Sequence, residues 1–169
     1  MAFLYNIGIQ AYHLAIQLAA PFNEKAALLC KGRKEVWKKA AGIQRGEGRL
    51  VWFHAASLGE FEQGRPVIEA LKAAEPATQI LLTFFSPSGY EIRKNYTGAD
   101  YILYLPGDTR RNAVRLIEKF RPDAAVFIKY EFWFHYLNEL NKRNIPVYLI
   151  SAIFRPNQPF FKSWGELHR

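Results

Sequence analysis

The sequence has very few of the residues from which disulfides and metal centres are built. Its single cysteine, Cys30, has no partner for an internal disulfide, so nothing in the chain requires an oxidising compartment. The four histidines do not fall at metal-ligand spacings, and no closely spaced pair of aspartates is present. We therefore expect a reducing, cytoplasmic compartment and a site that uses neither a metal nor a cofactor.

Glycine-rich loops that hold nucleotides are also missing. Neither G-x-G-x-x-G nor G-x-x-x-x-G-K-[S/T] occurs in the 169 residues, so the usual dinucleotide and nucleoside-triphosphate cradles are not supported. What is present is the composition of a folded protein, because half of the residues are hydrophobic and 15% are aromatic. The length allows one well-buried domain with an appendage, rather than two full domains.

Charged side chains are absent from residues 1–23. The polar residues of this segment recur at intervals of four, three and four, which places Asn6, Gln10, His13 and Gln17 on one narrow stripe of a helix. The span just reaches the roughly 20 residues that a membrane crossing needs. The polar stripe instead favours a helix that lies in a membrane interface as an uncleaved anchor. The alternative is an apolar helix that packs on its own domain.

Residues 24–49 form a basic connecting segment. They hold eight Lys or Arg residues and three Glu residues, and so supply five of the eight net positive charges. Next to an apolar helix, this cluster favours an anionic membrane surface, where each basic residue contributes on the order of 1 kcal/mol. A solvated basic helix is the alternative. No zinc spacing or recognition-helix pattern accompanies the charge, so we expect no nucleic-acid partner.

From residue 50 onward, short apolar runs alternate with amphipathic segments. The runs predict strands at 50–56, 79–85, 101–105, 124–129 and 147–151, and the segments predict helices at 63–74, 88–95, 109–120 and 132–143. A further helix is expected near Pro159, and Pro66 fits the first turn of its helix. Repeated strand–helix units predict an α/β domain over residues 50–169, with a Rossmann-like parallel sheet covered by helices on both faces.

Ligands of open α/β sheets bind outside the carboxyl ends of the strands. The loops expected there contain the polar or turn residues Ser57, Gly59, Glu60, Ser86, Ser88, Gly89, Glu131 and Arg155. The two glutamates suggest a general base with a neighbouring carboxylate, since a sugar hydroxyl needs a proton acceptor to become a nucleophile. For either glutamate alone, a carboxylate that stabilises the first turn of a helix is the alternative.

Four motifs in register resemble those of the 3-deoxy-D-manno-octulosonic acid (Kdo) transferases, which attach Kdo to lipid A. They are HAASLGE at 54–60, TFFSPSG at 83–89, YLPGD at 104–108, and EFW at 131–133 followed by IPV at 145–147. The resemblance extends to the uncharged N-terminal helix. It implies the N-terminal, acceptor-binding half of a B-type glycosyltransferase, whose C-terminal, donor-binding half is absent from these residues.

The resemblance also implies roles for particular residues. Glu60 matches the catalytic base of an inverting, metal-independent transfer from CMP-Kdo to a lipid A precursor, and Glu131 matches a second carboxylate of the cleft. The loop residues Ser57, Gly59, Ser86, Ser88 and Gly89 match positions near the acceptor, and Arg155 is expected to meet an anionic acceptor group. The expected location is the cytoplasmic face of the inner membrane, in lipopolysaccharide biosynthesis. These residues alone are expected to be inactive.

The chain departs from many family members just before Glu131, where Lys129 replaces a carboxylate. Two hypotheses of other classes also remain open at this point. One is a Rossmann-like nucleotide-binding module of another enzyme, which gives no role to the N-terminal helix. The other is a non-catalytic domain that binds membrane surfaces, which leaves the two glutamates unexplained.

Overall fold

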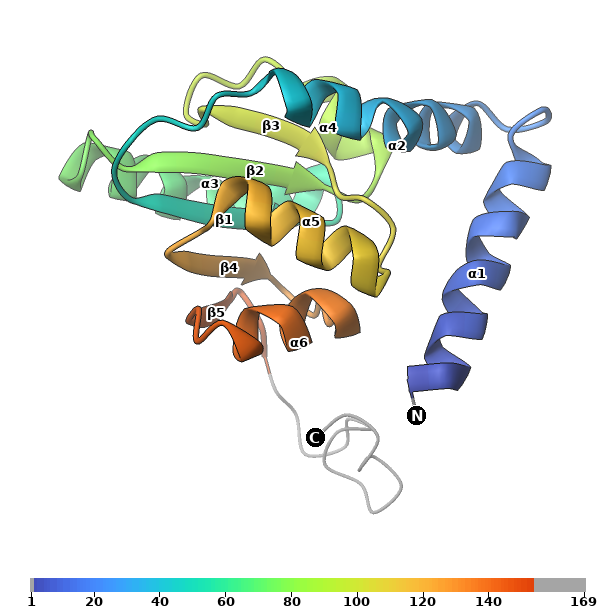
Figure 1. Ribbon diagram of the computed structural model, residues 1–169. Coiled ribbons are helices and arrows are strands. Elements are labelled where there is room, and N and C mark those ends of the chain that lie inside the picture. Colours follow the sequence, from blue (N-terminus) through green and yellow to red (C-terminus); the bar gives the residue numbers. More distant parts are fainter. Residues whose placement is uncertain (1, 154–169) are drawn as a thin grey trace.

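The computed structural model describes residues 2–153, so Arg155 and the helix expected near Pro159 lie outside the described residues. Helices and strands alternate from residue 50, and two helices precede them (Figure 1). The elements are α1 (Ala2–Ala19), α2 (Glu24–Gly42), β1 (Leu50–Ala55), α3 (Leu58–Ala74), β2 (Gln79–Phe84), α4 (Pro87–Arg93), β3 (Tyr101–Tyr104), α5 (Arg110–Phe120), β4 (Ala124–Ile128), α6 (Phe134–Lys142) and β5 (Val147–Ile150).

The five strands form one parallel sheet in the order β3-β2-β1-β4-β5. β1 is central and pairs with β2 on one side and β4 on the other, with Val51 opposite both Ile80 and Ala124. The chain therefore adds β2 and β3 on one side of β1 and then adds β4 and β5 on the other side. This reversal places a topological switch point between β1 and β4, where such sheets bind ligands.

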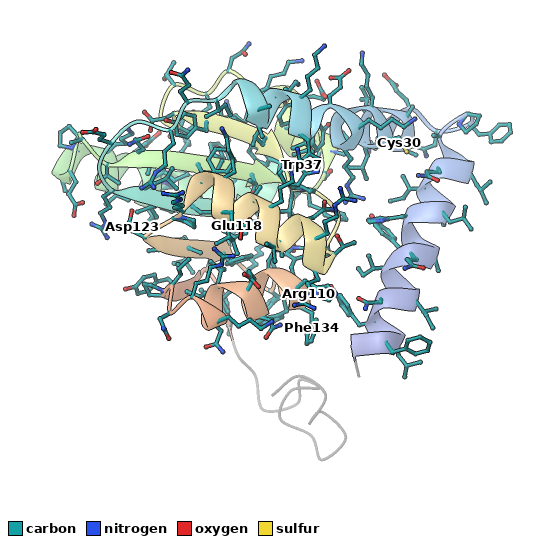
Figure 2. The ribbon with its side chains drawn as sticks, in the orientation of Figure 1. Cys30, Trp37, Arg110, Glu118, Asp123 and Phe134 are labelled. Carbon is teal, nitrogen blue, oxygen red and sulfur yellow. The ribbon has the colours of Figure 1, made fainter. Side chains whose placement is uncertain are left out.

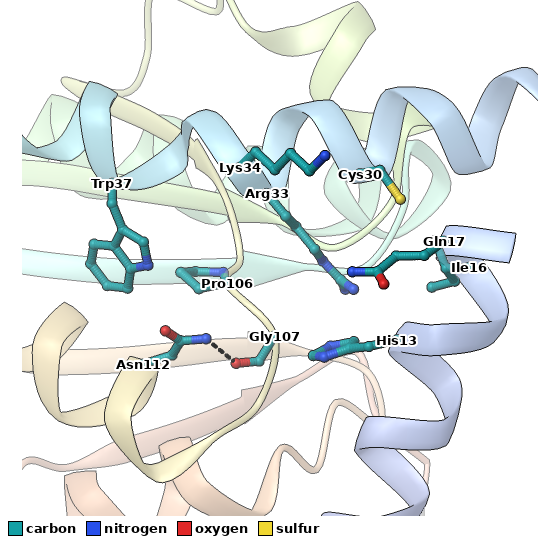
Figure 3. Close-up of a pocket in the computed structure, with 10 residues that line it drawn as sticks. All are labelled: His13, Ile16, Gln17, Cys30, Arg33, Lys34, Trp37, Pro106, Gly107 and Asn112. Atoms are coloured by element: carbon teal, nitrogen blue, oxygen red, sulfur yellow. Dashed lines mark hydrogen bonds between the residues drawn. The ribbon is translucent and has the colours of Figure 1, made fainter. Parts of the chain in front are cut away.

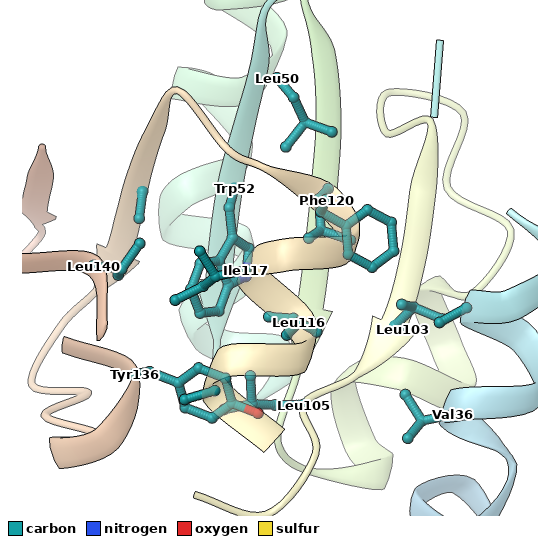
Figure 4. Packing of buried hydrophobic residues seen from close by; sticks show 14 of the residues in the cluster. Val36, Leu50, Trp52, Leu103, Leu105, Leu116, Ile117, Phe120, Tyr136 and Leu140 are labelled. Carbon is teal, nitrogen blue, oxygen red and sulfur yellow. The ribbon is translucent and has the colours of Figure 1, made fainter. Parts of the chain in front are cut away.

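Side chains of β1 alternate between two apolar cores. Leu50 and Trp52 belong to the core under α5 and α6, whereas Val51 and Phe53 belong to the core under α3 and α4. α5 contributes residues at intervals typical of one helix face, namely Ala113, Leu116, Ile117 and Phe120 (Figure 4). Burial on both faces explains why β1 is apolar throughout except at His54.

The predicted α/β class and all five predicted strands are confirmed, with strand ends within one residue of those expected. The predicted start of α3 at residue 63 is wrong, because the helix begins at Leu58. The segment expected as a loop, 57–60, therefore contains the N-cap and first turn of α3. Pro66 is not in the first turn but inside the helix, where it leaves the Glu62 carbonyl without its usual intrahelical donor.

The basic segment is largely helical. α2 buries Leu29, Val36 and Ala40 against the domain and exposes most of its lysines. A Cβ atom at Gly32 would lie 2.2 Å from Cε2 of Tyr104, so only glycine permits this close approach of α2 to β3. The basic charges are therefore carried by a helix that is packed onto the edge of the sheet. The division of the chain at residues 23 and 49 stays a prediction.

α1 stands across the side of the sheet at which the strands end (Figure 1). Ile16 packs against the core under α3 and α4, and other contacts are polar: the Tyr5 hydroxyl donates to Asp108, and Oδ1 of Asn6 lies 2.6 Å from Nε2 of His135. Phe134 lies at the start of α6 (Figure 2). Its ring packs beside Tyr5, with 5.4 Å between the ring centroids. The polar stripe of α1 thus contributes to its contact with the domain.

The apolar residues of α1 are mostly exposed. Phe3, Leu4, Leu14 and Leu18 have between 56% and 73% of their surface accessible. Of the two alternatives for this segment, the structure shows α1 docked on its own domain, but with much of its apolar surface turned outward. Among residues 2–153, no helix is both long and apolar enough to span a membrane.

Candidate functional site

The two predicted carboxylates lie on either side of the switch point. Glu60 is in the first turn of α3, directly after β1, and Glu131 follows β4. Because β1 and β4 are parallel neighbours, these two segments leave the sheet on the same edge. The carboxylates are close enough for the negative charge of Glu131 to raise the pKa of Glu60. The structure therefore brings together the two residues that the sequence suggests for acid–base chemistry.

Glu60 is held by the backbone and partly removed from water. Its Oε2 accepts a hydrogen bond of 2.6 Å from the Ala56 N–H. Burial raises the pKa of this carboxyl above 4.5, and the charge of Glu131 adds to the rise. The Ala56 hydrogen bond and the charges of His54 and Lys129 oppose it. A carboxylate with a raised pKa is a better proton acceptor than an ordinary glutamate, so Glu60 suits a general base.

Glu131 is oriented by a chain of buried polar groups. Its Oε2 accepts a 2.8 Å hydrogen bond from Nε1–H of Trp133 and lies 3.5 Å from Nε2 of His54. Trp133 Nε1 is also 3.1 Å from that histidine nitrogen. Because the indole N–H faces Nε2, this arrangement assigns the proton of a neutral His54 to Nδ1. Glu131 therefore has a position fixed by Trp133 and His54.

The other end of His54 is anchored in the core. Nδ1 lies 2.9 Å from Oγ1 of Thr83 and 3.1 Å from the Thr83 carbonyl oxygen. Thr83 Oγ1 also accepts a 2.8 Å hydrogen bond from Nε1–H of Trp52. His54, Thr83 and Trp52 are all fully buried. Sequence reasoning assigned them no role. The one available signal was a pair of polar residues on adjacent strands that are otherwise apolar, since His54 is in register with Thr83.

The backbone turns sharply between β4 and Glu131. Lys129 has a φ of 65°, a left-handed conformation that is uncommon for a residue with a Cβ atom. Such a conformation costs on the order of 1–3 kcal/mol and is often retained at functional sites. The ammonium group of Lys129 is therefore carried by a residue with a strained backbone. Its charge also acts on Glu60, whose pKa it lowers.

The expected acceptor-binding residues are placed around the same edge. Ser57 is the N-cap residue of α3 but makes no side-chain capping hydrogen bond, and a Cβ at Gly59 would meet nothing within 4 Å. Ser86 caps α4 by accepting a 3.2 Å hydrogen bond from the Ser88 N–H, and the two hydroxyls lie 2.9 Å apart. Close packing explains the glycine at position 89, because a Cβ there would lie 2.3 Å from Cδ1 of Phe84.

Asp108, within the YLPGD motif, is a third carboxylate near this edge and is buried. It accepts hydrogen bonds from the backbone N–H groups of His135 and Tyr136, at 3.1 and 3.2 Å, and from the Tyr5 hydroxyl. Burial raises its pKa. It therefore joins the loop after β3 to the start of α6 and to α1, which gives the motif a structural role.

Within the described part of the chain, no three His, Cys, Asp or Glu side chains are grouped so that they could hold a metal ion. The predicted substrate contact Arg155 lies outside that part.

A sequence model of the family described as 3-deoxy-D-manno-octulosonic-acid transferase matches residues 30–168. The chain belongs to this family. The match includes both carboxylates and the strands that position them, and it confirms the resemblance seen in the motifs. For the Kdo transferase family, the structure thus shows how the motifs at 54–60 and 131–133 are brought to one edge of the sheet.

Several curated relatives carry the same description. A 3-deoxy-D-manno-octulosonic acid transferase of Chlamydia trachomatis is 30% identical over 122 residues, covering 69% of this chain and 28% of the relative. A probable mitochondrial one of Arabidopsis thaliana is 31% identical over 123 residues, covering 72% of this chain and 27% of the relative. One of Aquifex aeolicus is 36% identical over 84 residues, covering 49% and 23%. The chain thus spans less than a third of the length of these relatives.

Among solved structures, a UDP-N-acetylglucosamine 2-epimerase superimposes with a TM-score of 0.50 and 16% identity, covering 72% of this chain and 38% of the other. At this identity the likeness concerns the fold alone. It supports the same class of α/β architecture, a parallel sheet flanked by helices.

Proposed function

We propose that this chain is the acceptor-binding half of a B-type glycosyltransferase that transfers Kdo from CMP-Kdo to a lipid A precursor in lipopolysaccharide biosynthesis. The observation that carries the proposal is the pair Glu60 and Glu131 at the switch point, with the pKa of Glu60 raised by burial and by Glu131. Family membership supplies the reaction class. The names of the relatives support a Kdo transferase.

In this reaction Glu60 acts as the general base. Its carboxylate accepts the proton of the acceptor sugar hydroxyl as the hydroxyl oxygen attacks the anomeric carbon of Kdo. A new C–O bond forms, and the bond between that carbon and the CMP phosphate oxygen breaks with its electron pair leaving on CMP. A single displacement from the opposite side inverts the anomeric configuration. No metal takes part in the proposed step.

Glu131 and its neighbours position the base and shape its field. The negative charge of Glu131 favours the protonated form of Glu60, and so favours uptake of the hydroxyl proton. Its own place is fixed by Trp133 and His54. Ser57 and Gly59 lie on the same first turn of α3 as the base, and Ser86 and Ser88 lie at the start of α4. We assign these residues, with Gly89 and Arg155, to the acceptor-binding surface.

The proposed location is the cytoplasmic face of the inner membrane. Support comes from α1, which leaves Phe3, Leu4, Leu14 and Leu18 exposed, and from the lysines of α2 beside it. Apolar insertion and attraction to anionic lipids together give an interfacial helix its affinity. A domain held at the surface in this way keeps its acceptor edge close to a lipid-linked sugar.

The test is Glu60→Gln in a full-length enzyme that contains this domain. Glutamine can still accept the hydrogen bond from Ala56, but it cannot take up the proton. We expect kcat to fall by about 10²- to 10⁴-fold, the usual contribution of a positioned base, while the melting temperature stays within about 2 °C. Glu69→Gln, an exposed position farther along α3, is the matched control.

The pH dependence gives a second measurement on the same enzyme. Only the ionised form of Glu60 accepts a proton, so kcat should decline as pH falls through the raised pKa of this group, starting above the range of an ordinary glutamate. A Glu60→Gln enzyme with turnover within a few-fold of wild type would contradict the catalytic role. It would leave Glu60 as a carboxylate that only stabilises the start of α3.

A further inference from the structure

A cavity lies where α1, α2, the loop after β3 and α5 meet, apart from the two carboxylates (Figure 3). Its volume is about 190 Å³, and its polar lining comes from His13 and Gln17 of α1, Arg33 and Lys34 of α2, and Asn112 of α5. A water molecule takes up about 30 Å³ of liquid volume, so the cavity has room for a tetrahedral anion with some of its water. The sequence motifs assign no role to this cavity.

Arg33 is the dominant charge in this cavity. Two of its guanidinium nitrogens, Nε and Nη2, are buried and have no hydrogen-bond partner among the described residues. Burial lowers the pKa of Arg33, and the largest opposing influences come from tyrosines and from Cys30 rather than from a carboxylate. A buried cation with unsatisfied donors is costly unless an anion pairs with it.

The remaining lining adds to the same electrostatic character. Lys34 contributes a second cation, and no Asp or Glu is among the residues that line the cavity in the described structure. Burial lowers the pKa of His13, and the charge of Arg33 lowers it further, so its ring is available here mainly as a neutral hydrogen-bonding group. Asn112 is committed to the loop, since its Nδ2 donates a 2.8 Å hydrogen bond to the Gly107 carbonyl.

We propose that this cavity binds a phosphate group, with Arg33 as its principal ligand and Lys34 and His13 beside it. A guanidinium presents several N–H groups in a planar fork that matches the oxygens of a phosphate, and the adjacent ammonium balances a second negative charge. The phosphate belongs either to a lipid headgroup or to a soluble molecule. The proposal concerns binding to these residues and does not depend on the transfer reaction.

The cavity also has structural consequences for α1 and for the carboxylate edge. His13 and Gln17 belong to α1, so a bound phosphate would help to hold this helix on the domain. Arg33 lies 4.7 Å from the ring centroid of Phe85, and Phe85 stacks on Trp133 at a centroid distance of 4.7 Å. Trp133 in turn donates to Glu131. Arg33 is therefore linked to Glu131 through the stacked rings of Phe85 and Trp133.

The first experiment titrates the ¹⁵N-labelled chain of 169 residues with inorganic phosphate at constant ionic strength, with sodium chloride as the reference salt. We expect saturable shifts of the Arg33 Nε–H and Gly107 N–H signals. Arg33→Gln should weaken phosphate binding at least tenfold, and Lys34→Gln by a smaller factor. Arg111→Gln, an exposed arginine on α5, removes the same charge outside the cavity and should leave the affinity unchanged.

The second experiment distinguishes the two sources of phosphate. Phosphatidylcholine vesicles are mixed with phosphatidic acid, which has a phosphate monoester, or with phosphatidylglycerol at the same surface charge. Tighter binding to phosphatidic acid than to phosphatidylglycerol, lost in Arg33→Gln, supports a lipid headgroup as the source of the phosphate. Binding of inorganic phosphate without this preference for phosphatidic acid supports a soluble source.

Lys34→Gln keeps this test informative if Arg33→Gln fails to fold, because Lys34 is exposed. Failure of both phosphate and phosphatidic acid to shift the Arg33 and Gly107 signals would overturn the proposal. So would equal affinity for phosphate in wild type, Lys34→Gln and Arg33→Gln.

Discussion

Strand β1 and helix α1 lie at the same edge of the sheet but differ in how much of their apolar surface they bury. β1 buries apolar residues on both faces, and its one polar residue, His54, is fully satisfied by Thr83 and Trp133. α1 turns Tyr5 and Asn6 toward the domain and leaves much of its apolar surface outside. In β1, therefore, apolar burial stabilises the fold and the polar exception positions the site, whereas in α1 polar contacts orient the helix.

The largest expected effect tests whether the edge of the sheet at which β1 ends is sufficient for the transfer reaction by itself. Residues 1–169 alone should give no measurable Kdo transfer from CMP-Kdo, because the donor is held by the other half of the proposed enzyme. Holding both reactants in the right geometry can supply roughly 7–11 kcal/mol of the barrier. A radiolabelled transfer assay with the isolated chain, alongside a full-length family member, measures this. Transfer by the isolated chain would show that this edge of the sheet binds the donor as well as the acceptor.

The next effect concerns Thr83 of β2, whose hydroxyl contacts the buried polar groups of Trp52 and His54 on β1. Thr83→Val should lower the free energy of unfolding by about 1–3 kcal/mol, since it leaves the buried Trp52 Nε1–H without its partner. Thr83→Ser keeps the hydroxyl oxygen and should retain most of the stability. On α1, Asn6→Leu should cost less than about 1 kcal/mol. Chemical denaturation of the three variants checks this, and equal losses of stability in Thr83→Val and Asn6→Leu would contradict the contrast between the sheet and α1.

A smaller effect is expected at the outer surface of α1. Replacing Leu14 and Leu18 by serine should weaken binding to anionic vesicles about tenfold or more, because inserted leucines contribute apolar burial. Unfolding stability should hardly change. The control replaces Val67 and Ile92, which are exposed on α3 and α4, by serine. Co-sedimentation with vesicles at low and high salt separates apolar insertion from charge attraction. An equal loss of vesicle binding in the Leu14/Leu18 variant and in the Val67/Ile92 control would contradict an interfacial role for α1.

The smallest effect compares one substitution in the two regions. Gly8 in α1 and Gly59 in α3 both have open space where a Cβ would lie. Alanine at either position should gain up to about 1 kcal/mol of helix stability, measurable by circular dichroism and thermal unfolding. Gly59→Ala should in addition raise KM for the acceptor in a full-length enzyme, and Gly8→Ala should not. An unchanged KM in Gly59→Ala would remove Gly59 from the proposed acceptor surface.

The sheet was predictable because β1, β2 and β4 are short, apolar and separated by amphipathic helices. The start of α3 was not, because Gly59 and Pro66 are poor helix formers, and the Glu60 contact with Ala56 that accompanies the first turn depends on three-dimensional structure. The position of both glutamates at one edge followed from the parallel topology. The His54–Thr83–Trp52 network could not be predicted in this way. Thr83 is 29 or more residues from His54 and Trp52 in sequence, and only the pairing of β1 with β2 brings them together.

The central position of β1 determines when each of its two edges can be paired during synthesis. β2 can pair with one edge of β1 soon after it is made, but the partner on the other edge is 73 residues further on, as the pairing of Val51 with Ala124 shows. At about 5–20 residues per second, this interval is roughly 4–15 seconds on the ribosome. We expect an aggregation-prone intermediate in that window, with Trp52 and Phe53 beside an open strand edge. Nascent chains stalled before and after β4 should therefore differ sharply in chaperone binding.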